Sequence, residues 1–242
     1  MRMQALVQAI YPPQCLCCDA VVDQDFALCG PCWRDTPFVA GLACDRCGLP
    51  LVGEEATGAR ILCDDCLRLA RPWDRGRAVA TYGGNARRMV LQLKHADRLD
   101  LARPLGDWMA RAAADILEPG MIIAPVPLHW LRLLRRRTNQ SALLSARIAR
   151  STGLDHIPDL LVRIRHTPSQ EGRGRDARFR NLSAALRAHP RRIAQAQGRH
   201  VLLVDDVMTS GATLAAGADA LLAAGVAQVS VLVLARVAHP GG

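Results

Sequence analysis

Residues 201–213 read VLLVDDVMTSGAT, and this stretch decides the fold. Its four leading aliphatic residues predict a buried strand that runs into the adjacent acids Asp205 and Asp206. A helix of small residues is predicted over 211–225, and VSVLVLAR (229–236) predicts a second core strand. Apolar strands that alternate with helices are typical of a parallel sheet with right-handed crossovers. The sequence therefore predicts an α/β fold.

The same alternation extends from this stretch towards the N-terminus. Apolar runs predict strands over 78–84, 121–127 and 160–164. Apolar residues at a spacing of three and four predict helices that start near Asn85, Leu101 and Asn139 and end near 95, 117 and Gly153. The stretch RLARPWDRG (68–76) indicates a linker. We therefore expect two parts, residues 1–70 and residues 71–242.

The polar residues after the strand over 201–204 predict a ligand site. In parallel sheets ligands bind at the carboxyl ends of strands, and a helix N-terminus there offers free N–H groups and partial positive charge to a phosphate. Gly211 lets the backbone approach closely, and the hydroxyls of Thr209, Ser210 and Thr213 are hydrogen-bond donors. The two carboxylates only accept hydrogen bonds, which suits the vicinal hydroxyls of a ribose. A regular strand would send Asp205 and Asp206 to opposite faces, so both reach one ligand only where the strand is irregular.

Three other interpretations of the acid pair compete with a sugar-phosphate site. A Walker B pair needs a P-loop, and the sequence contains no Gly-Lys. A receiver domain needs a lysine downstream, and the only lysine is Lys94, which we interpret as structural. A plain buried strand would place two acids against four aliphatic side chains, which is unfavourable unless the charges are paired.

Nine cysteines fall within residues 15–66 and form four C-x-x-C pairs, with Cys17 left over. Each pair brings two thiolates close enough to share a tetrahedral Zn²⁺, and two pairs complete a structural site. Disulfides are disfavoured because no cysteine follows Cys66, and a redox motif needs a single pair on a βαβ unit. The pairs are expected to combine in chain order, with an interleaved combination left open. The predicted ligands are Cys15, Cys18, Cys29, Cys32, Cys44, Cys47, Cys63 and Cys66.

The net charge of +9 is unevenly distributed. Residues 127–199 hold 16 Arg against 4 acidic residues, a balance of +12, whereas residues 1–70 hold 5 Arg against 9 acidic residues, a balance of −4. A polyanion would therefore meet the central region. The longest apolar stretch, 220–235, is interrupted and shorter than a bilayer span, and the N-terminus carries no signal-peptide cleavage pattern. We expect a cytoplasmic protein with no membrane insertion.

The chain resembles the ComF family, in which a double zinc ribbon precedes a domain like the type I phosphoribosyltransferases. The resemblance rests on the four C-x-x-C pairs and on VLLVDDVMTSGATL (201–214), which is similar to the PRPP-binding motif of those enzymes. Further matching stretches are MVLQLKH (89–95), PVPLHWLRLLRRRTNQ (125–140) and LVRIRHTPSQ…RFRNLSAAL (161–186). One departure is Arg-Arg-Thr-Asn-Gln at 136–140, where the family usually has Arg-Gly-Phe-Asn-Gln.

The resemblance implies a Rossmann-like parallel sheet and a role for each part of the site. Asp205 and Asp206 would be the catalytic acids that hold the ribose hydroxyls, and Mg²⁺ would bridge the diphosphate and ribose oxygens. The implied 5′-phosphate loop comprises Thr209, Ser210, Gly211, Ala212 and Thr213. The implied pyrophosphate loop comprises Pro125, Val126, Pro127, Leu128 and His129. The implied lid, which would exclude water from an oxocarbenium-like centre, contains Arg173, Arg175 and Arg178.

Two functions stay open from the sequence. One is an enzyme of nucleotide or cofactor metabolism that transfers a phosphoribosyl group from PRPP to an acceptor, which no residue identifies. The other is a non-catalytic factor for incoming single-stranded DNA, because the ComF family is associated with natural competence and the 127–199 region is basic. Only Trp130 and Phe179 lie in that region as aromatic stacking residues. We expect a PRPP-binding protein linked to competence and DNA uptake.

Overall fold

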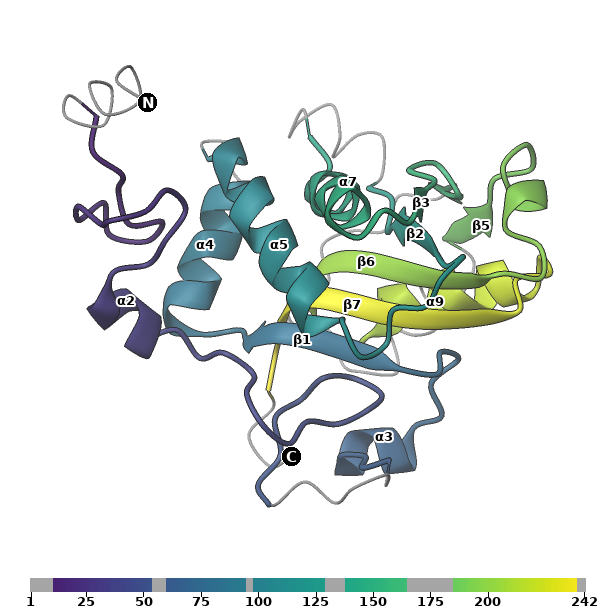
Figure 1. Cartoon of the computed structure of the whole chain (residues 1–242). Helices are drawn as coiled ribbons and strands as arrows, with labels where there is room; N and C mark the ends of the chain where they lie inside the picture. The colour runs from purple at the N-terminus through teal and green to yellow at the C-terminus, as the bar shows by residue number, and fades with distance from the viewer. Residues whose placement is uncertain (1–10, 54–59, 95–97, 129–137, 165–184, 239–242) are drawn as a thin grey trace.

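The centre of the molecule is a five-stranded sheet (Figure 1). The computed structural model describes residues 11–53, 60–94, 98–128, 138–164 and 185–238, and the structural statements below concern these residues. The strand order is β1-β7-β6-β2-β3, and every neighbouring pair is parallel. The strands are β1 Gly76–Thr81, β2 Ile122–Pro125, β3 Asp155–His156, β6 His200–Met208 and β7 Gln228–Arg236. The predicted parallel α/β sheet is therefore confirmed.

Helices cover both faces of the sheet. Three pack on one face and α9 packs on the other (Figure 1). Along β6, Leu202 and Val204 pack with the three-helix layer, whereas Val201 and Leu203 pack with α9. None of the described helices has the length and apolar character needed to cross a bilayer. The helices are α4 Gly84–Lys94, α5 Ala102–Ala112 and α7 Gln140–Thr152 on the first face, and α9 Ala212–Leu222 on the second.

The helix boundaries agree with the sequence prediction at α7 and differ at α5. α7 begins after Asn139 and ends at Gly153, whose φ of 74° is the left-handed conformation that glycine adopts readily. α5 was expected to reach Leu117 and instead ends at Ala112. The apolar spacing continues beyond the helix because Ala113 and Ile116 remain buried in the turns that follow. The short 3₁₀ helix Leu99–Leu101 leads into α5.

A second, two-stranded sheet lies outside the main one. The strand predicted over 160–164 forms as β4 Leu161–Arg163, and it pairs antiparallel with β5 Leu186–Ala188 instead of joining the parallel sheet. Only Leu161 of this strand is fully buried, a pattern typical of antiparallel pairs with one solvated face. Leu186 packs with Ala212 and Ala216, so this small sheet covers the start of α9. The 3₁₀ helix Ile193–Gln195 connects it to β6.

The cysteine-rich segment forms two groups of sulfur atoms. The first cysteine cluster is Cys15, Cys18, Cys29 and Cys32; the second cysteine cluster is Cys44, Cys47, Cys63 and Cys66. The one-turn helices α2 Gly30–Arg34 and α3 Asp64–Arg68 each begin directly after a cluster cysteine. In Figure 1, α2 lies beside α4 and α3 lies beneath β1. All four residues of the second cluster belong to the hydrophobic core that contains α9 and Val231.

The interpretation of residues 68–76 as a linker is wrong. Trp73 is 2% exposed and belongs to the same core as the second cysteine cluster, and Arg71 is 7% exposed. Gly76, at the start of β1, has no room for a Cβ, because one would collide with the carbonyl oxygen of Arg46. The segment therefore packs the second cysteine cluster directly against the sheet.

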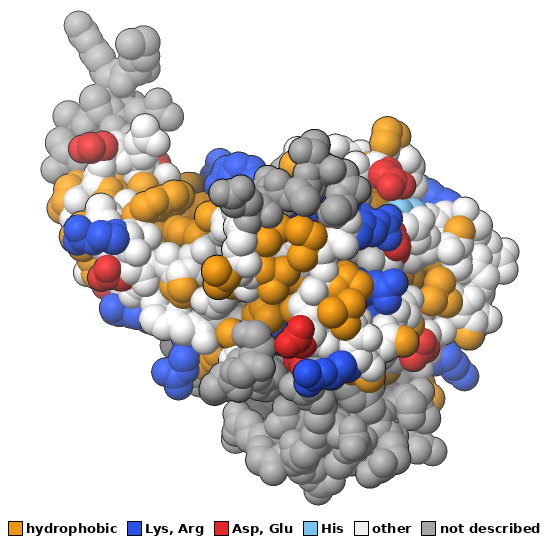
Figure 2. Space-filling model, turned by 90° about the horizontal axis from the view of Figure 1, so that it is seen from below, with side chains coloured by type: hydrophobic (Ala, Val, Ile, Leu, Met, Phe, Trp, Pro, Cys, Tyr) orange, Lys and Arg blue, Asp and Glu red, His pale blue; other side chains and the backbone are white. Residues whose placement is uncertain are grey.

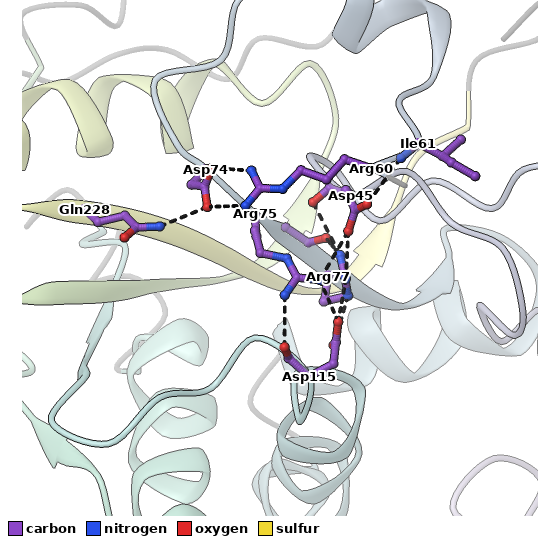
Figure 3. Close-up of polar contacts among 9 residues, drawn as sticks. Asp45, Arg60, Ile61, Asp74, Arg75, Arg77, Asp115 and Gln228 are labelled. Atoms are coloured by element: carbon purple, nitrogen blue, oxygen red, sulfur yellow. Dashed lines mark hydrogen bonds and ion pairs between the residues drawn. The ribbon is translucent and has the colours of Figure 1, made fainter. Parts of the chain in front are cut away.

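A network of arginines and aspartates fixes this contact at the amino ends of β1 and β7 (Figure 3). Asp45, next to Cys44, accepts hydrogen bonds from Arg77 at 2.9 Å and from Arg75 at 3.3 Å. Both arginines also bind the Asp115 carboxylate, at 2.6 and 2.9 Å. Although burial opposes it, hydrogen bonding to the two guanidinium groups lowers the pKa of Asp45. A second bridge runs from Arg60 through Asp74 to Gln228.

Candidate functional site

The two adjacent acids lie near the carboxyl end of β6 and contact helices of the same layer. The Asp205 carboxylate accepts a hydrogen bond from the Ser141 hydroxyl of α7 at 2.9 Å, and an Asp206 oxygen lies 3.1 Å from the Lys94 ammonium of α4. The register between β6 and β7 runs continuously to Asp205 and resumes at Val207, while the Asp206 N–H donates to the Asp205 carboxylate. The register offset is the same on both sides of Asp206, and the two carboxylates reach the layer of α4 and α7 through these contacts.

The electrostatic environment of the acids is unfavourable for two full charges. Burial and the neighbouring charge of Asp206 raise the pKa of Asp205 to about 7, against the opposing hydrogen bond from Ser141. Near neutral pH the Asp205 carboxyl is therefore only partly ionised. A ligand that brings a cation or hydroxyl donors to this carboxyl stabilises its ionised form. Strongly shifted acids are typical of binding and catalytic sites.

Residues 209–213 span the turn after β6 and the first two residues of α9, and we call them the phosphate turn after the ligand that the sequence predicts. Gly211 precedes the first residue of α9 with φ of 80°, a conformation that favours glycine. Thr209 is exposed, whereas Ser210 is buried and its hydroxyl accepts a 3.4 Å hydrogen bond from the Ala212 N–H. The first N–H groups of an α-helix have no intrahelical acceptor and are available to an anion. The turn therefore combines backbone donors with the Thr209 hydroxyl, while the Ser210 hydroxyl is bonded to the Ala212 N–H.

Two buried arginines that the sequence analysis missed support the phosphate turn from inside. Arg71 donates to the Ser210 carbonyl at 2.6 Å, and Arg236 at the end of β7 donates to the Thr209 carbonyl at 2.6 Å. Arg236 is 1% exposed, and neither arginine forms an ion pair with a described acidic residue. The available signals were the tryptophan in the supposed linker and an arginine that closes an otherwise apolar strand.

The segment after β2 lies beside β6. Val126 is buried, and its N–H donates to the Val204 carbonyl at 2.8 Å, one residue before Asp205. The Val126 carbonyl accepts from the Asn139 amide at 3.3 Å, and the Pro127 carbonyl accepts from Arg163 at 3.2 Å. Val126 through Leu128 therefore follow the strand next to β6, and Pro125 is the last residue of that strand. The remaining loop and lid predictions lie outside the described residues: His129, Arg173, Arg175 and Arg178.

The geometry of both cysteine clusters fits a tetrahedral zinc ion. Within each cluster the four sulfur atoms lie within 4.8 Å of one another, and Cys17 is in neither. The sulfur atoms of Cys18 and Cys29 are 3.6 Å apart, and those of Cys47 and Cys63 are 3.7 Å apart. A tetrahedron with Zn–S bonds of about 2.3 Å has edges of ~3.8 Å. The clusters therefore support structural zinc, and the pairs combine in chain order.

Within each cluster the surroundings lower the pKa of some thiols and raise that of others, among them Cys32, whose pKa burial raises. Against the effect of burial, N–H donation from Cys29 and Cys17 lowers the pKa of Cys15 to about 6. Hydrogen bonds with Cys47 and the other two thiols of the second cluster lower the pKa of Cys44. The deprotonated thiolate, and not the thiol, is the form of cysteine that binds the metal.

Comparison with known proteins agrees with this two-part organisation. Residues 6–67 match the double zinc ribbon domain, and residues 110–241 match the phosphoribosyl transferase domain. The second match covers more than half of the chain and includes the acids, the phosphate turn and the segment after β2.

Relatives match along nearly the whole chain. DNA utilization protein YhgH of Escherichia coli is 34% identical over 217 residues, which cover 87% of this chain and 91% of the relative. Competence protein F of Haemophilus influenzae is 29% identical, with 72% of this chain and 78% of the relative covered. Competence protein ComFC of Bacillus subtilis is 24% identical, with 92% and 94% covered. The chain therefore belongs to the ComF family, in which a double zinc ribbon precedes a phosphoribosyltransferase domain.

Proposed function

We propose that the chain binds PRPP at the carboxyl end of β6. The observation that carries the proposal is that Asp205 and Asp206 contact the same helical layer and stand directly before a turn at a helix N-terminus. The ribose 2′- and 3′-hydroxyls would donate to the two carboxylates. The 5′-phosphate would accept hydrogen bonds from the N–H groups of Gly211, Ala212 and Thr213 and from the Thr209 hydroxyl.

The diphosphate would lie towards β2, the neighbour of β6 in the sheet. Pro125 to His129 form its proposed loop, and the proposed lid arginines would close over the reacting carbon. Mg²⁺, when bound with PRPP, would be held near Asp205 and Asp206 and would screen their charges. Lys94, 3.1 Å from Asp206, neutralises part of that charge in the ligand-free protein.

Phosphoribosyl transfer is the reaction that this arrangement favours. The bond between C1′ and the pyrophosphate oxygen breaks, pyrophosphate leaves with the electron pair, and a nucleophilic acceptor bonds to C1′ and then loses a proton. The carboxylates of Asp205 and Asp206 stabilise the positive charge that develops on the ribose. Pyrophosphate release in the presence of nucleobases, amines or ammonia tests turnover, and no release with any of them would limit the function to binding.

Calorimetric titration with Mg²⁺ and PRPP tests the binding proposal. The double variant Asp205→Asn/Asp206→Asn is expected to bind about tenfold more weakly or worse, which corresponds to about 1.4 kcal/mol. Asp159→Asn is the matched control, because Asp159 pairs with Arg192 on the surface. Equal affinity of the double variant and the wild type would exclude the acids from the site.

Handling of single-stranded DNA in the cytoplasm is the second candidate function, favoured by the basic region and by the names of the relatives. Seven of the 16 arginines in 127–199 are described, and Arg147, Arg192 and Arg199 among them pair with aspartates. On the face seen in Figure 2, basic side chains are scattered among acidic and hydrophobic ones. The arginines outside the described residues would therefore supply most of the attraction.

Salt dependence tests the DNA proposal. We expect an oligonucleotide to bind at about 50 mM salt and to lose affinity steeply as salt rises, because phosphate contacts release counterions. Binding through aromatic stacking would be weak, since the region holds only Trp130 and Phe179. The absence of binding at low salt would remove this function and leave the PRPP proposal unaffected.

A further inference from the structure

A short series of contacts leads from the second cysteine cluster to the phosphate turn. Arg46 lies between Cys44 and Cys47, and its carbonyl accepts a 2.6 Å hydrogen bond from the Trp73 indole. The Arg71 guanidinium lies over the Trp73 ring, 5.3 Å from its centroid. The same guanidinium donates to the Ser210 carbonyl. Two side chains therefore separate the metal-binding knuckle from the turn.

These contacts leave little space for the turn to move. A Cβ on Gly211 would lie 2.8 Å from the Arg71 Nη1 and 3.1 Å from the Trp73 ring. The backbone of the turn thus rests directly on both side chains, and both are buried. Because cores are closely packed, a shift of the knuckle or of Trp73 is transmitted to the turn.

The buried charge of Arg71 also favours a functional link to the phosphate turn. Arg71 and Arg236 are buried beneath the turn without a described acidic partner, and the Nε of each has no hydrogen-bond partner. A buried charge without a counter-ion is unfavourable. Both guanidinium groups add positive potential to the N-terminus of α9, where an anion would be stabilised. A phosphate at the turn would supply the negative charge that the two arginines lack.

We propose that Arg71 is a positioning residue that couples the second cysteine cluster to the phosphate turn. It holds the Ser210 carbonyl inward, so that the N–H groups at the start of α9 stay directed at the ligand, and Trp73 holds Arg71 against the zinc-ordered knuckle. This inference rests on the proposed PRPP function for its ligand. It assigns the second zinc site to ligand binding as well as to folding.

The first cysteine cluster offers a matched control. The Asn85 amide donates to the Cys32 carbonyl at 3.1 Å, as the Trp73 indole donates to the Arg46 carbonyl. Asn85 stands at the start of α4, whereas Lys94, which reaches Asp206, is its last residue. Asn85→Ala and Trp73→Phe therefore each remove a hydrogen bond to a carbonyl of a cysteine knuckle. Trp73→Phe also removes the part of the ring that lies against Gly211, and only Trp73 lies in the contact series to the turn.

Titration calorimetry with Mg²⁺ and PRPP measures the coupling. Arg71→Met is expected to weaken binding about tenfold or more, and Trp73→Phe about fivefold, the effect of one lost hydrogen bond. Arg236→Met should weaken binding too, because Arg236 supports the Thr209 carbonyl independently of the zinc cluster. Asn85→Ala should leave the affinity unchanged. Zinc content of two ions per chain verifies that each variant keeps its ribbon.

Amide hydrogen exchange in the ligand-free protein separates this inference from the proposed function. Exchange at residues 209–213 should accelerate in Arg71→Met and Trp73→Phe and stay unchanged in Asn85→Ala. If the wild type binds no PRPP, the proposed function fails and the exchange comparison alone decides the coupling. Arg71→Met and Trp73→Phe proteins that keep both zinc ions and match wild type in affinity and in exchange would overturn the inference.

Discussion

The two ends of the central sheet differ in how their charges are compensated. At the amino ends of β1 and β7, Asp45 and Asp115 share Arg75 and Arg77, and burial of the cluster is matched by opposite charges. At the carboxyl end, two aspartates stand side by side with Lys94, and two arginines lie buried without acidic partners among the described residues. At the first end, each of these charged side chains has a partner of opposite charge. The second end would be completed by the ligand that we propose, which carries hydroxyl donors and anionic oxygens.

This difference indicates which charges serve folding and which serve binding. Hydrogen bonding to arginines lowers the pKa of Asp45, whereas burial and a like charge raise that of Asp205 to about 7. Removing a charge at the amino end should therefore destabilise the protein, and removing one at the carboxyl end should stabilise it while it weakens ligand binding. Groups that oppose stability in this way are typical of functional sites.

Arg77→Met is expected to have the largest effect. The Arg77 side chain is 16% exposed and binds two aspartates, so its loss leaves Asp45 partly buried without its nearest partner. We expect the free energy of unfolding to fall by about 3 kcal/mol, as for other broken buried pairs. Urea denaturation of the zinc-loaded protein at neutral pH measures this change in the free energy of unfolding. A change of a few tenths of a kcal/mol would contradict the structural role of this end.

Gly211→Ala and Gly153→Ala form the next comparison. Both glycines have positive φ, 80° and 74°, which costs an alanine about 1–2 kcal/mol. A Cβ on Gly153 meets open space, while one on Gly211 meets Arg71 and Trp73. Thermal denaturation should therefore show a larger loss of stability for Gly211→Ala. Equal losses would mean that the phosphate turn does not rest tightly on the two side chains.

Asp205→Asn is expected to raise stability, and the gain should grow with pH. Because the folded pKa of about 7 lies above the ordinary value of 3.8, the wild type loses stability as pH rises from about 4 through 7. The variant has no such loss, so its advantage should be larger near pH 8 than near pH 5.5, by on the order of 2 kcal/mol. Denaturation curves of both proteins at the two pH values measure the difference. A variant less stable than wild type at the higher pH would contradict the assignment.

Asp19→Asn beside the first cysteine cluster should have the smallest effect. Asp19 lies 3.6 Å from Arg98, and their side chains are 60% and 32% exposed. An exposed ion pair of this kind contributes about 0.5 kcal/mol or less. The same denaturation assay at low and high salt should detect almost no change. A loss as large as that of Arg77→Met would mean that this exposed ion pair stabilises the protein as much as the network beside the second cysteine cluster does.

Local sequence patterns predicted the parts of the molecule that depend on neighbouring residues. The run VLLV predicts β6, the small residues after Gly211 predict α9, and the C-x-x-C spacing predicts the two clusters, because each pattern reports a repeated local geometry. Two contacts could not be predicted in this way. Arg71 and Ser210 are separated by 139 positions, and the antiparallel pairing of β4 depends on β5, which follows later in the chain.

The position of the acids was predictable in part. The sequence placed Asp205 and Asp206 at the end of a core strand, and regular alternation would have sent them to opposite layers. Their common orientation depends on the Asp206 N–H bonding to the Asp205 carboxylate and on partners from α4 and α7. Such partners come from distant parts of the chain, so no local sequence pattern predicts them.

The central claim is that the carboxyl end of the sheet is the ligand-binding end. Backbone amide shifts in an NMR titration with Mg²⁺ and PRPP test it most directly, because they report on both ends at once. We expect large shifts at 205–213 and near Val126, and almost none at Asp45, Arg77 and Gln228. Shifts concentrated at the amino end, or no shifts under saturating ligand, would contradict the assignment.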